Sequence, residues 1–294
     1  MHAGNILCAL LAYIAAKSKS GKFIIRIEDL DPLRCPRTVA KNMIDLLAEF
    51  GLTSDEEIIY QSDRTDAYKA AENKLKERAR VYPCFCSRAE LLAATAPRLH
   101  DGGVVYSGKC RDLSEREINE LYKKKKPCYR IETPDETVSF TDGITGEYSQ
   151  NLARECGDFI LRRSDGVYAY QLAVAVDDCF SSVTEAVRGA DLISSTPRQI
   201  WLMRLLNLRP PEYYHIPLVC DSSGRKLSKS EGDSAVRLLD RLSVQEILGA
   251  LGFAAGILEE NRPSTLAELT ELFDWRKIKR DKIYLPHCLN SLDL

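Results

Sequence analysis

The sequence has 294 residues, of which 45% are hydrophobic and 29% are charged, with 41 Lys and Arg against 43 Asp and Glu. This composition excludes a disordered or fibrous chain, and the length allows either one large domain with insertions or two domains. The formal net charge of −2 argues against a protein that coats nucleic acid through its overall charge, so any RNA contact requires a local patch.

Ten cysteines are spread along the chain, and most of them are isolated, which favours a reducing compartment over a disulfide scaffold. The apolar run at residues 6–16 has no Lys or Arg before it and is shorter than the about 20 residues that a membrane span requires. We therefore predict a cytoplasmic, monomeric protein that has no membrane segment and no obligate protein partner.

The chain begins with apolar residues at helical spacing over residues 6–14, and this first helix should end near Gly21. Residues 22–27 are predicted to form a buried strand, and helices are predicted over residues 36–50 and 65–80. Alternating helices and short apolar strands indicate an α/β fold with a parallel sheet. Because βαβ units alternate, a strand should precede the first helix, and we expect the sheet to lack that strand.

The middle of the chain differs in composition from both flanks. Residues 81–148 contain Pro, Gly, paired Cys and a basic run at residues 123–126, which indicates an insertion. We expect residues 1–80 and 149–233 to be the two halves of one α/β domain. Residues 234–294 should form a small helical subdomain.

In the second half of the domain, the apolar segments 158–161 and 168–176 are predicted to be strands. Residues 197–206 are predicted to form a helix, and residues 244–251 place apolar side chains on one helical face. The pattern contains no internal repeat and no low-complexity tract.

Two motifs point to phosphate chemistry. His2, Gly4 and Asn5 lie at the start of the first helix, where free backbone N–H groups and the positive end of the helix dipole suit a phosphate. Lys226 and Lys229, in the sequence Lys-Leu-Ser-Lys-Ser, can neutralise charge on a triphosphate. Each motif alone also has an ordinary interpretation, a chance match for the first and a solvated loop for the second.

Taken together, the early His-x-Gly-x helix start and the late Lys-Leu-Ser-Lys-Ser loop resemble the two signature motifs of class I aminoacyl-tRNA synthetases. Residues 26–31, 177–178, 187–192 and 196–199 resemble the glutamyl branch of that family. The resemblance covers nearly the whole chain and implies a Rossmann-like catalytic domain.

The resemblance also implies roles for the two motifs. His2, Lys229 and Lys226 would stabilise charge while ATP and glutamate form glutamyl-adenylate, with Mg²⁺ on the phosphates. His2, Gly4, Asn5 and Lys229 would contact ATP.

Only about 60 residues follow the lysine loop, which is too few for an anticodon-binding domain of ordinary size. The chain therefore resembles the branch of the family that lacks this domain and transfers glutamate to the queuosine base in the anticodon loop of tRNA(Asp). Two alternatives stay open: a truncated glutamyl-tRNA synthetase that charges a tRNA 3′ end, and a non-catalytic relative that binds tRNA or a nucleotide. The basic run 123–126 can contact phosphates, although a solvated helix end is its ordinary interpretation.

Cys84, Cys86 and Cys110 cluster in the insertion and can supply three thiolates to a structural zinc ion. The chemistry of the residues leaves the fourth ligand open, because His100 is the conventional donor whereas the family resemblance selects Tyr106. The alternative interpretation is three unrelated buried thiols.

For the amino acid, the resemblance assigns Glu28 to the ammonium group of bound glutamate, and Tyr170 and Arg188 to its carboxylate end. A carboxylate at the end of a strand can hold an ammonium, and a guanidinium fork matches a carboxylate. Without the resemblance, Arg188 would be interpreted as a surface ion pair and Tyr170 as strand packing.

The sequence departs from the family pattern in three places. No strand with an Arg-x-Ala-Pro-Ser-Pro-x-Gly loop precedes His2, Asn5 stands where many class I enzymes have a second His, and Leu227 replaces a Met. If these 294 residues are the whole protein, we expect impaired glutamate activation and a sheet without one inner strand.

Overall fold

The computed structural model describes residues 1–33, 35–93, 105–220 and 238–289. Its helices are α1 (Ala3–Ser18), α2 (Arg37–Glu49), α3 (Thr65–Lys76), α4 (Arg88–Ala93), α5 (Glu115–Tyr122), α6 (Tyr170–Phe180), α7 (Thr196–Leu205), α9 (Val244–Ala255) and α10 (Leu266–Leu272). Its strands are β1 (Arg26–Ile27), β2 (Ile59–Tyr60), β3 (Val81–Cys84), β4 (Cys128–Ile131), β5 (Thr137–Asp142), β6 (Gly146–Asn151), β7 (Phe159–Arg162), β8 (Glu185–Gly189), β9 (Glu212–Ile216), β10 (Val219–Cys220) and β11 (Ile283–Tyr284). No helix in these ranges is both long and apolar enough to cross a membrane.

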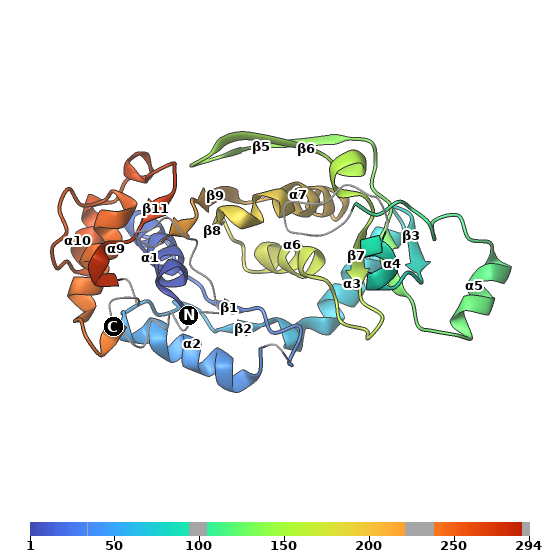
Figure 1. The fold of residues 1–294 in the computed structure, drawn as a ribbon, viewed down its shortest axis with the longest axis horizontal. Helices are drawn as coiled ribbons and strands as arrows, with labels where there is room; N and C mark the ends of the chain where they lie inside the picture. The colour runs from blue at the N-terminus through green and yellow to red at the C-terminus, as the bar shows by residue number, and fades with distance from the viewer. Residues whose placement is uncertain (34, 94–104, 221–237, 290–294) are drawn as a thin grey trace.

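The strands form one mixed sheet and three smaller ones. The mixed sheet has the order β6-β5-β9-β8, in which β8, β9 and β5 run parallel and β6 is antiparallel to β5. Strands β1 and β2 form a separate parallel pair, as do β10 and β11, whereas β3, β4 and β7 form an antiparallel sheet. The parallel pairs, with α6 and α7 packed together beside them in Figure 1, confirm the predicted α/β fold.

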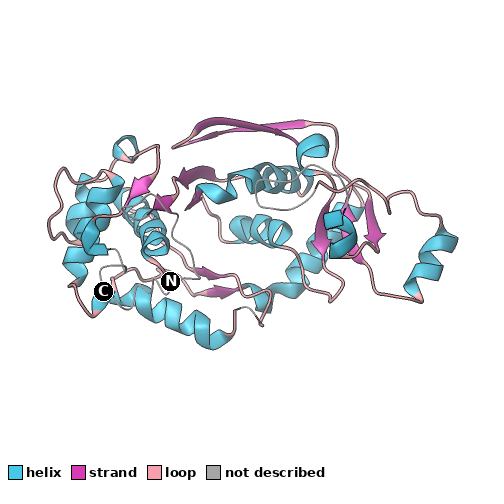
Figure 2. Cartoon of the chain, in the orientation of Figure 1, coloured by secondary structure: helices cyan, strands magenta, loops and turns pink. Residues whose placement is uncertain are grey.

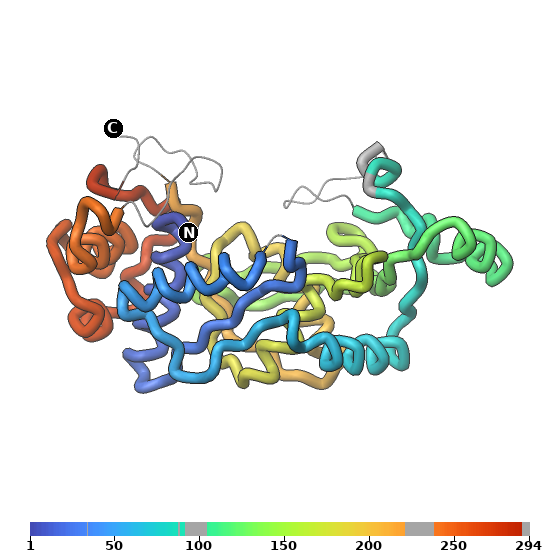
Figure 3. The backbone as a smooth tube through the Cα atoms, turned by 90° about the horizontal axis from the view of Figure 1, so that it is seen from below, coloured from blue at the N-terminus to red at the C-terminus, as the bar shows by residue number. Residues whose placement is uncertain are grey.

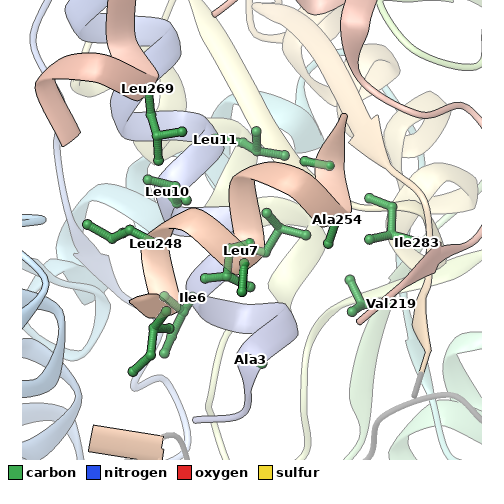
Figure 4. Close-up of a cluster of buried hydrophobic side chains, with 14 of the residues drawn as sticks. Ala3, Ile6, Leu7, Leu10, Leu11, Val219, Leu248, Ala254, Leu269 and Ile283 are labelled. Atoms are coloured by element: carbon green, nitrogen blue, oxygen red, sulfur yellow. The ribbon is translucent and has the colours of Figure 1, made fainter. Parts of the chain in front are cut away.

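Helix α1 lies at the centre of the largest apolar core. Its apolar side chains are buried on more than one face, because α1 packs against both β8 and α10. The contacts shown in Figure 4 include Leu248 of α9, Leu269 of α10, and Val219 and Ile283 of the β10–β11 pair. Each fully buried Leu or Ile contributes about 1.5–3 kcal/mol, so the tail helices and the start of the chain stabilise each other.

The insertion lies at the far end of an elongated molecule from α9 and α10, as Figures 1 and 3 show. This end of the molecule consists of the β3-β4-β7 sheet with α4 and α5 beside it. Of the predicted range 81–148, β5 and the start of β6 belong instead to the mixed sheet, and β7 follows that range in the chain. Between the two ends, the mixed sheet, α6 and α7 form the middle of the molecule, with the β1–β2 pair and α2 along one side (Figure 2).

The segment 168–176, predicted as a strand, is instead helical from Tyr170 onward, and Tyr170 is the first residue of helix α6. Residues 172–175 are all buried, so the apolar run faces protein on every side. A run without alternation carries no period, and a buried helix then has the same pattern as a buried strand.

The predicted strand 22–27 is also shorter than expected, because only Arg26 and Ile27 pair as a strand. The backbone N–H groups of Phe23 and Ile25 donate to the side chains of Asp55 and Ser54, not to a neighbouring strand. The helices predicted over residues 36–50, 65–80, 197–206 and 244–251 correspond to α2, α3, α7 and α9 and are confirmed.

Candidate active site

A cavity of about 890 Å³ lies between β1 and β8, which belong to separate sheets in the described structure. Its lining includes a group of charged and phenolic side chains, Arg26, Glu28, Tyr170, Asp178 and Arg188. The three side chains that the family resemblance assigned to glutamate therefore come from three different elements and face one cavity. They follow β1, begin α6 and lie in β8, respectively.

Glu28 shares the cavity with a buried ion pair. Arg26 Nη1 donates to Asp178 Oδ1 at 2.6 Å, and Arg26 Nη2 lies 3.6 Å from Glu28 Oε1. Although 44% of the Glu28 side chain is accessible, its place inside the cavity removes hydration and raises its pKa, while the cations of Arg26 and Arg188 pull in the opposite direction. A ligand cation such as an ammonium group would favour the ionised form of Glu28.

Arg188 is held at both ends of its guanidinium group. Its Nη1 donates to Gln199 Oε1 at 2.7 Å, its Nη2 donates to Thr196 Oγ1 at 2.6 Å, and its Nε donates to His215 Nε2 at 3.0 Å. The guanidinium carbon also lies 4.9 Å from the centre of the Tyr213 ring. Only 9% of the residue is exposed, so Arg188 belongs to the buried wall of the cavity and not to a surface ion pair.

His215 is in turn bonded to Asp142, and neither side chain is exposed. The distance from His215 Nδ1 to Asp142 Oδ2 is 2.6 Å. Burial and the nearby Arg188 cation lower the pKa of His215 against the opposing effect of Asp142. Burial would raise the pKa of Asp142, but the hydrogen bonds from His215 and from the backbone N–H groups of Thr145 and Ile144 lower it.

Tyr170 lies near both the Glu28 carboxylate and the Arg188 guanidinium group. Burial and the carboxylate of Glu28 raise its pKa, and Arg188 and Gln199 act in the opposite direction. Its phenol therefore stays protonated at neutral pH and can donate a hydrogen bond to a ligand carboxylate.

The adjacent Asp177 and Asp178 join α6 to the β1–β2 side of the molecule. Asp178 takes the Arg26 bond already described, whereas Asp177 accepts hydrogen bonds from Gln61, Arg64 and Tyr68 at 2.6–3.0 Å. These bonds hold the Glu28 side of the cavity in place relative to Tyr170, because both aspartates belong to the same helix as Tyr170.

His2 precedes α1 as its N-cap, and the backbone N–H of His2 donates to Asn5 Oδ1 at 3.0 Å. Gly4 is buried: a Cβ there would lie 3.1 Å from the His2 ring and 3.3 Å from Val219. The absence of a side chain at Gly4 thus lets His2 lie close to the start of the helix. Lys226 and Lys229 fall within residues 221–237, outside the described residues, and that segment directly follows the β10 strand that contains Val219.

The predicted metal ligands come together in the insertion. The sulfur atoms of Cys84, Cys86 and Cys110 all lie within 4.8 Å of one another, with 3.6 Å between Cys86 Sγ and Cys110 Sγ. The Tyr106 oxygen lies 3.4 Å from Cys84 Sγ and 3.8 Å from Cys86 Sγ. His100, the other candidate, falls outside the described residues.

These distances are compatible with tetrahedral coordination of a metal ion. Zinc–sulfur bonds of about 2.3 Å place the ligand atoms of a tetrahedron about 3.8 Å apart. The interaction with the Cys128 thiol, against the effect of burial, lowers the pKa of Cys84 to about 4, which favours the thiolate that a metal ion requires.

Tyr106 is placed by an unusual backbone contact. It forms an isolated bridge with Gly157, whose φ is +64°, and a Cβ on Gly157 would lie 2.8 Å from the Tyr106 nitrogen. The Arg130 guanidinium carbon lies 4.1 Å from the centre of the Tyr106 ring, and Arg130 Nη1 donates to the backbone oxygen of Asp158 at 2.7 Å. The buried Arg130 cation thus lies beside the cysteine cluster. Three thiolates bound to a divalent ion would carry a net negative charge, which this cation would balance.

The sequence analysis gave no role to several residues around the cavity. Arg26, Asp178 and Gln199 lie in the segments that carried the family resemblance, so the motif contained them without assigning their contacts. His215 and Asp142 lie in no motif; each is a buried ionisable residue near the end of a short strand of mixed composition, which is not a distinctive sequence signal.

Comparisons with known proteins find similar sequences and similar folds. The family model for the catalytic domain of class I tRNA synthetases (E and Q) matches residues 1–248. A glutamyl-Q tRNA(Asp) synthetase from Neisseria gonorrhoeae is 44% identical over 286 residues, which cover 97% of this chain and 93% of that protein. Another, from Geobacter sulfurreducens, is 42% identical and covers 91% of this chain and 83% of that protein.

Two solved structures share the fold. The glutamate-tRNA synthetase from Elizabethkingia anophelis superposes with a TM-score of 0.84 at 23% identity, over 98% of this chain and 66% of that one. A glutamate tRNA ligase from Elizabethkingia meningosepticum in complex with its amino acid gives a TM-score of 0.82 at 23% identity, over 97% of this chain and 64% of that one. The chain therefore spans about two thirds of the length of these two structures.

Proposed function

Since this chain belongs to the class I tRNA synthetases (E and Q), we propose that it activates glutamate with ATP and transfers it to the queuosine base in the anticodon loop of tRNA(Asp). The choice of acceptor rests on relatives named glutamyl-Q tRNA(Asp) synthetase that match over 97% of this chain. The observation that carries the amino-acid specificity is the meeting of Glu28, Tyr170 and Arg188 in one cavity.

In this proposal, Glu28 pairs with the ammonium group of glutamate, and Arg188 with Tyr170 receives a carboxylate. The α-carboxylate of glutamate attacks the α-phosphorus of ATP, pyrophosphate leaves, and glutamyl-adenylate forms. Mg²⁺ bound with ATP neutralises phosphate charge. The protein contributes mainly by positioning the reactants, with no covalent intermediate on the chain.

ATP binds at the start of α1. His2, Gly4 and Asn5 lie there, and Lys226 and Lys229 stabilise the charge on the phosphates. Support for this placement comes from Gly4, which lies close to both the His2 ring and Val219 of β10, because the segment with the two lysines follows β10 in the chain.

Cys84, Cys86, Cys110 and Tyr106 would hold a structural zinc ion. Support comes from the donor set and its spacing, since three sulfurs and one phenol oxygen lie at distances typical of tetrahedral coordination. The ion would stabilise the insertion, which lies at the opposite end of the molecule from α1.

A transfer assay with labelled glutamate tests the acceptor. The substrates are tRNA(Asp) with and without queuosine, each also prepared without its 3′-terminal adenosine, and tRNA(Glu). We expect label on the queuosine-containing tRNA(Asp) whether or not the 3′ adenosine is present. Label only on intact tRNA(Glu) would identify a 3′-charging enzyme instead.

A further inference from the structure

Arg188 donates to His215, and His215 is bonded in turn to Asp142; neither the motifs nor the family resemblance singled out these two residues. Arg188 and His215 are paired in register on the parallel strands β8 and β9, and Asp142 is the last residue of the next strand, β5. Three neighbouring strands thus contribute an unbroken series, Asp142–His215–Arg188, that leads from the core to the cavity.

The proton positions in this series follow from the donor inventory. The Nε of an arginine always donates, so His215 Nε2 must accept the 3.0 Å bond from Arg188. The proton of the neutral imidazole is then on Nδ1, where it is donated to Asp142 Oδ2 at 2.6 Å. The lowered pKa values of His215 and Asp142 agree with a neutral imidazole beside an ionised carboxylate.

The series determines which donors of Arg188 remain for a ligand. A guanidinium group has five N–H donors, and the described structure uses three of them, for His215, Gln199 and Thr196. One N–H on each terminal nitrogen is left, which is the arrangement that binds a carboxylate in two places. A protonated His215 could not accept from Nε and would repel the guanidinium.

We propose that Asp142 and His215 are positioning residues that fix the rotation of Arg188 so that its two terminal nitrogens face a substrate carboxylate. This inference rests on the proposed glutamate specificity, because Arg188 is taken there as the carboxylate ligand. His215 does not touch the substrate; it acts through Arg188, and Asp142 acts by holding the Nδ1 tautomer of His215.

Two replacements of His215 separate the two bonds. In His215→Asn the amide lies near the former Nδ1 and can donate to Asp142, but no acceptor reaches Arg188. In His215→Gln the amide oxygen lies near the former Nε2 and can accept from Arg188. Tyr213→Phe, on the same strand as His215, is the matched control, since it keeps the ring beside Arg188 and removes only a hydroxyl that contacts Met203 of α7.

Glutamate-dependent exchange of pyrophosphate into ATP is the activity readout. We expect His215→Asn to raise the KM for glutamate by about tenfold to a hundredfold, as for the loss of a hydrogen bond to a charged group. The KM for ATP should stay within about threefold of the native value, and His215→Gln should recover most of the loss. In an Arg188→Lys background, which lacks Nε, His215→Asn should add no further loss.

An equal KM for glutamate in the native protein and His215→Asn would overturn the proposal, as would additive losses in the Arg188→Lys background. A general loss of structure would instead lower kcat and the kcat/KM values for both glutamate and ATP, and His215→Gln would not restore them.

Nitrogen-15 NMR of the histidine side chains of the native protein gives a second test that needs no activity. We expect the imidazole of His215 to be neutral and protonated on Nδ1 at pH 7 to 8. A neutral His215 with its proton on Nε2 would overturn the proposal, and this result does not depend on whether the variants fold. Absence of glutamate-dependent exchange in the native protein, with the Nδ1 tautomer present, would count against the proposed function while supporting the Asp142–His215–Arg188 series.

Discussion

The Arg188 end of the cavity and the cysteine cluster both bury ionisable groups, but they reach electrical balance differently. At Arg188, protein atoms alone supply a cation, a neutral imidazole and an anion, with matched donors and acceptors. In the cluster, three thiols and a phenol point at one another, and their nearest buried cation, Arg130, stacks on the phenol ring. The first arrangement is complete when the chain folds, whereas the second is completed by an ion, since metal binding and folding are linked.

The largest effect is therefore expected from removing metal. Apparent binding free energies of structural zinc ions are about 10–16 kcal/mol in small domains, so stripping the ion with a chelator should unfold the insertion locally. Hydrogen exchange should show that amides of β3 and β4 lose protection while those of α1 keep it. Cys86→Ser should behave in the same way.

Cys179→Ser is the matched control, because Cys179 is also a partly buried cysteine but lies in α6, outside the cluster. Metal analysis should find about one zinc per chain in this control and in the native protein. Unchanged protection of β3 and β4 after complete metal removal would show that the cluster needs no ion.

A second prediction tests the Arg188 end of the cavity. Arg188→Lys keeps the charge but loses the planar fork and the Nε donor, so the KM for glutamate should rise by about a hundredfold, in line with truncation of a buried charge pair. Arg154→Lys, on an exposed arginine bonded to Asp135, should leave it unchanged. Pyrophosphate exchange measures both, and equal values for the two variants would remove Arg188 from the substrate site.

A smaller effect is expected from the oxygen of Tyr106. Tyr106→Phe keeps the ring on which Arg130 stacks and removes only the phenol oxygen. Affinity for cobalt, followed by its absorption as a stand-in for zinc, should fall by about tenfold to a hundredfold, as is typical when a group around a metal site is removed. If His100 were the fourth ligand, Tyr106→Phe would bind cobalt like the native protein and His100→Ala would not.

The same contrast explains what the sequence could predict. The cysteine cluster is evident in the sequence because its ligands are chemically rare and closely spaced, and helices α2, α3 and α9 are evident because one face is apolar. Glu28 and Arg188 could be paired only through the family resemblance. His215 and Asp142 meet through sheet pairing between residues 73 positions apart, a relation that local periodicity does not carry. Helix α6 was predicted wrongly as a strand because burial on all sides removed its period.

The smallest expected effect is a pH dependence of folding stability that comes from His215, at the Arg188 end of the cavity. Because the folded pKa of His215 lies below its ordinary value of 6.5, the unfolded chain binds more protons than the folded one between the two values. The contribution of neutral His215 is thus fully present above about pH 6.5 and is lost as the pH falls toward the folded pKa, with a slope of at most about 1.4 kcal/mol per pH unit. Asp142, whose pKa is lowered from 3.8, adds a further loss only in stronger acid.

Denaturant unfolding from pH 7.5 to 5 can isolate this contribution. His215→Gln retains the other three histidines of the chain and cannot itself titrate, so its stability should fall less steeply with acid than that of the native protein. Equal slopes would mean that His215 titrates alike in the folded and unfolded chains, which a buried imidazole between Asp142 and Arg188 should not do. Added metal should stabilise the cysteine cluster equally in the native protein and in His215→Gln. It should leave the difference between the pH slopes of their unfolding free energies unchanged.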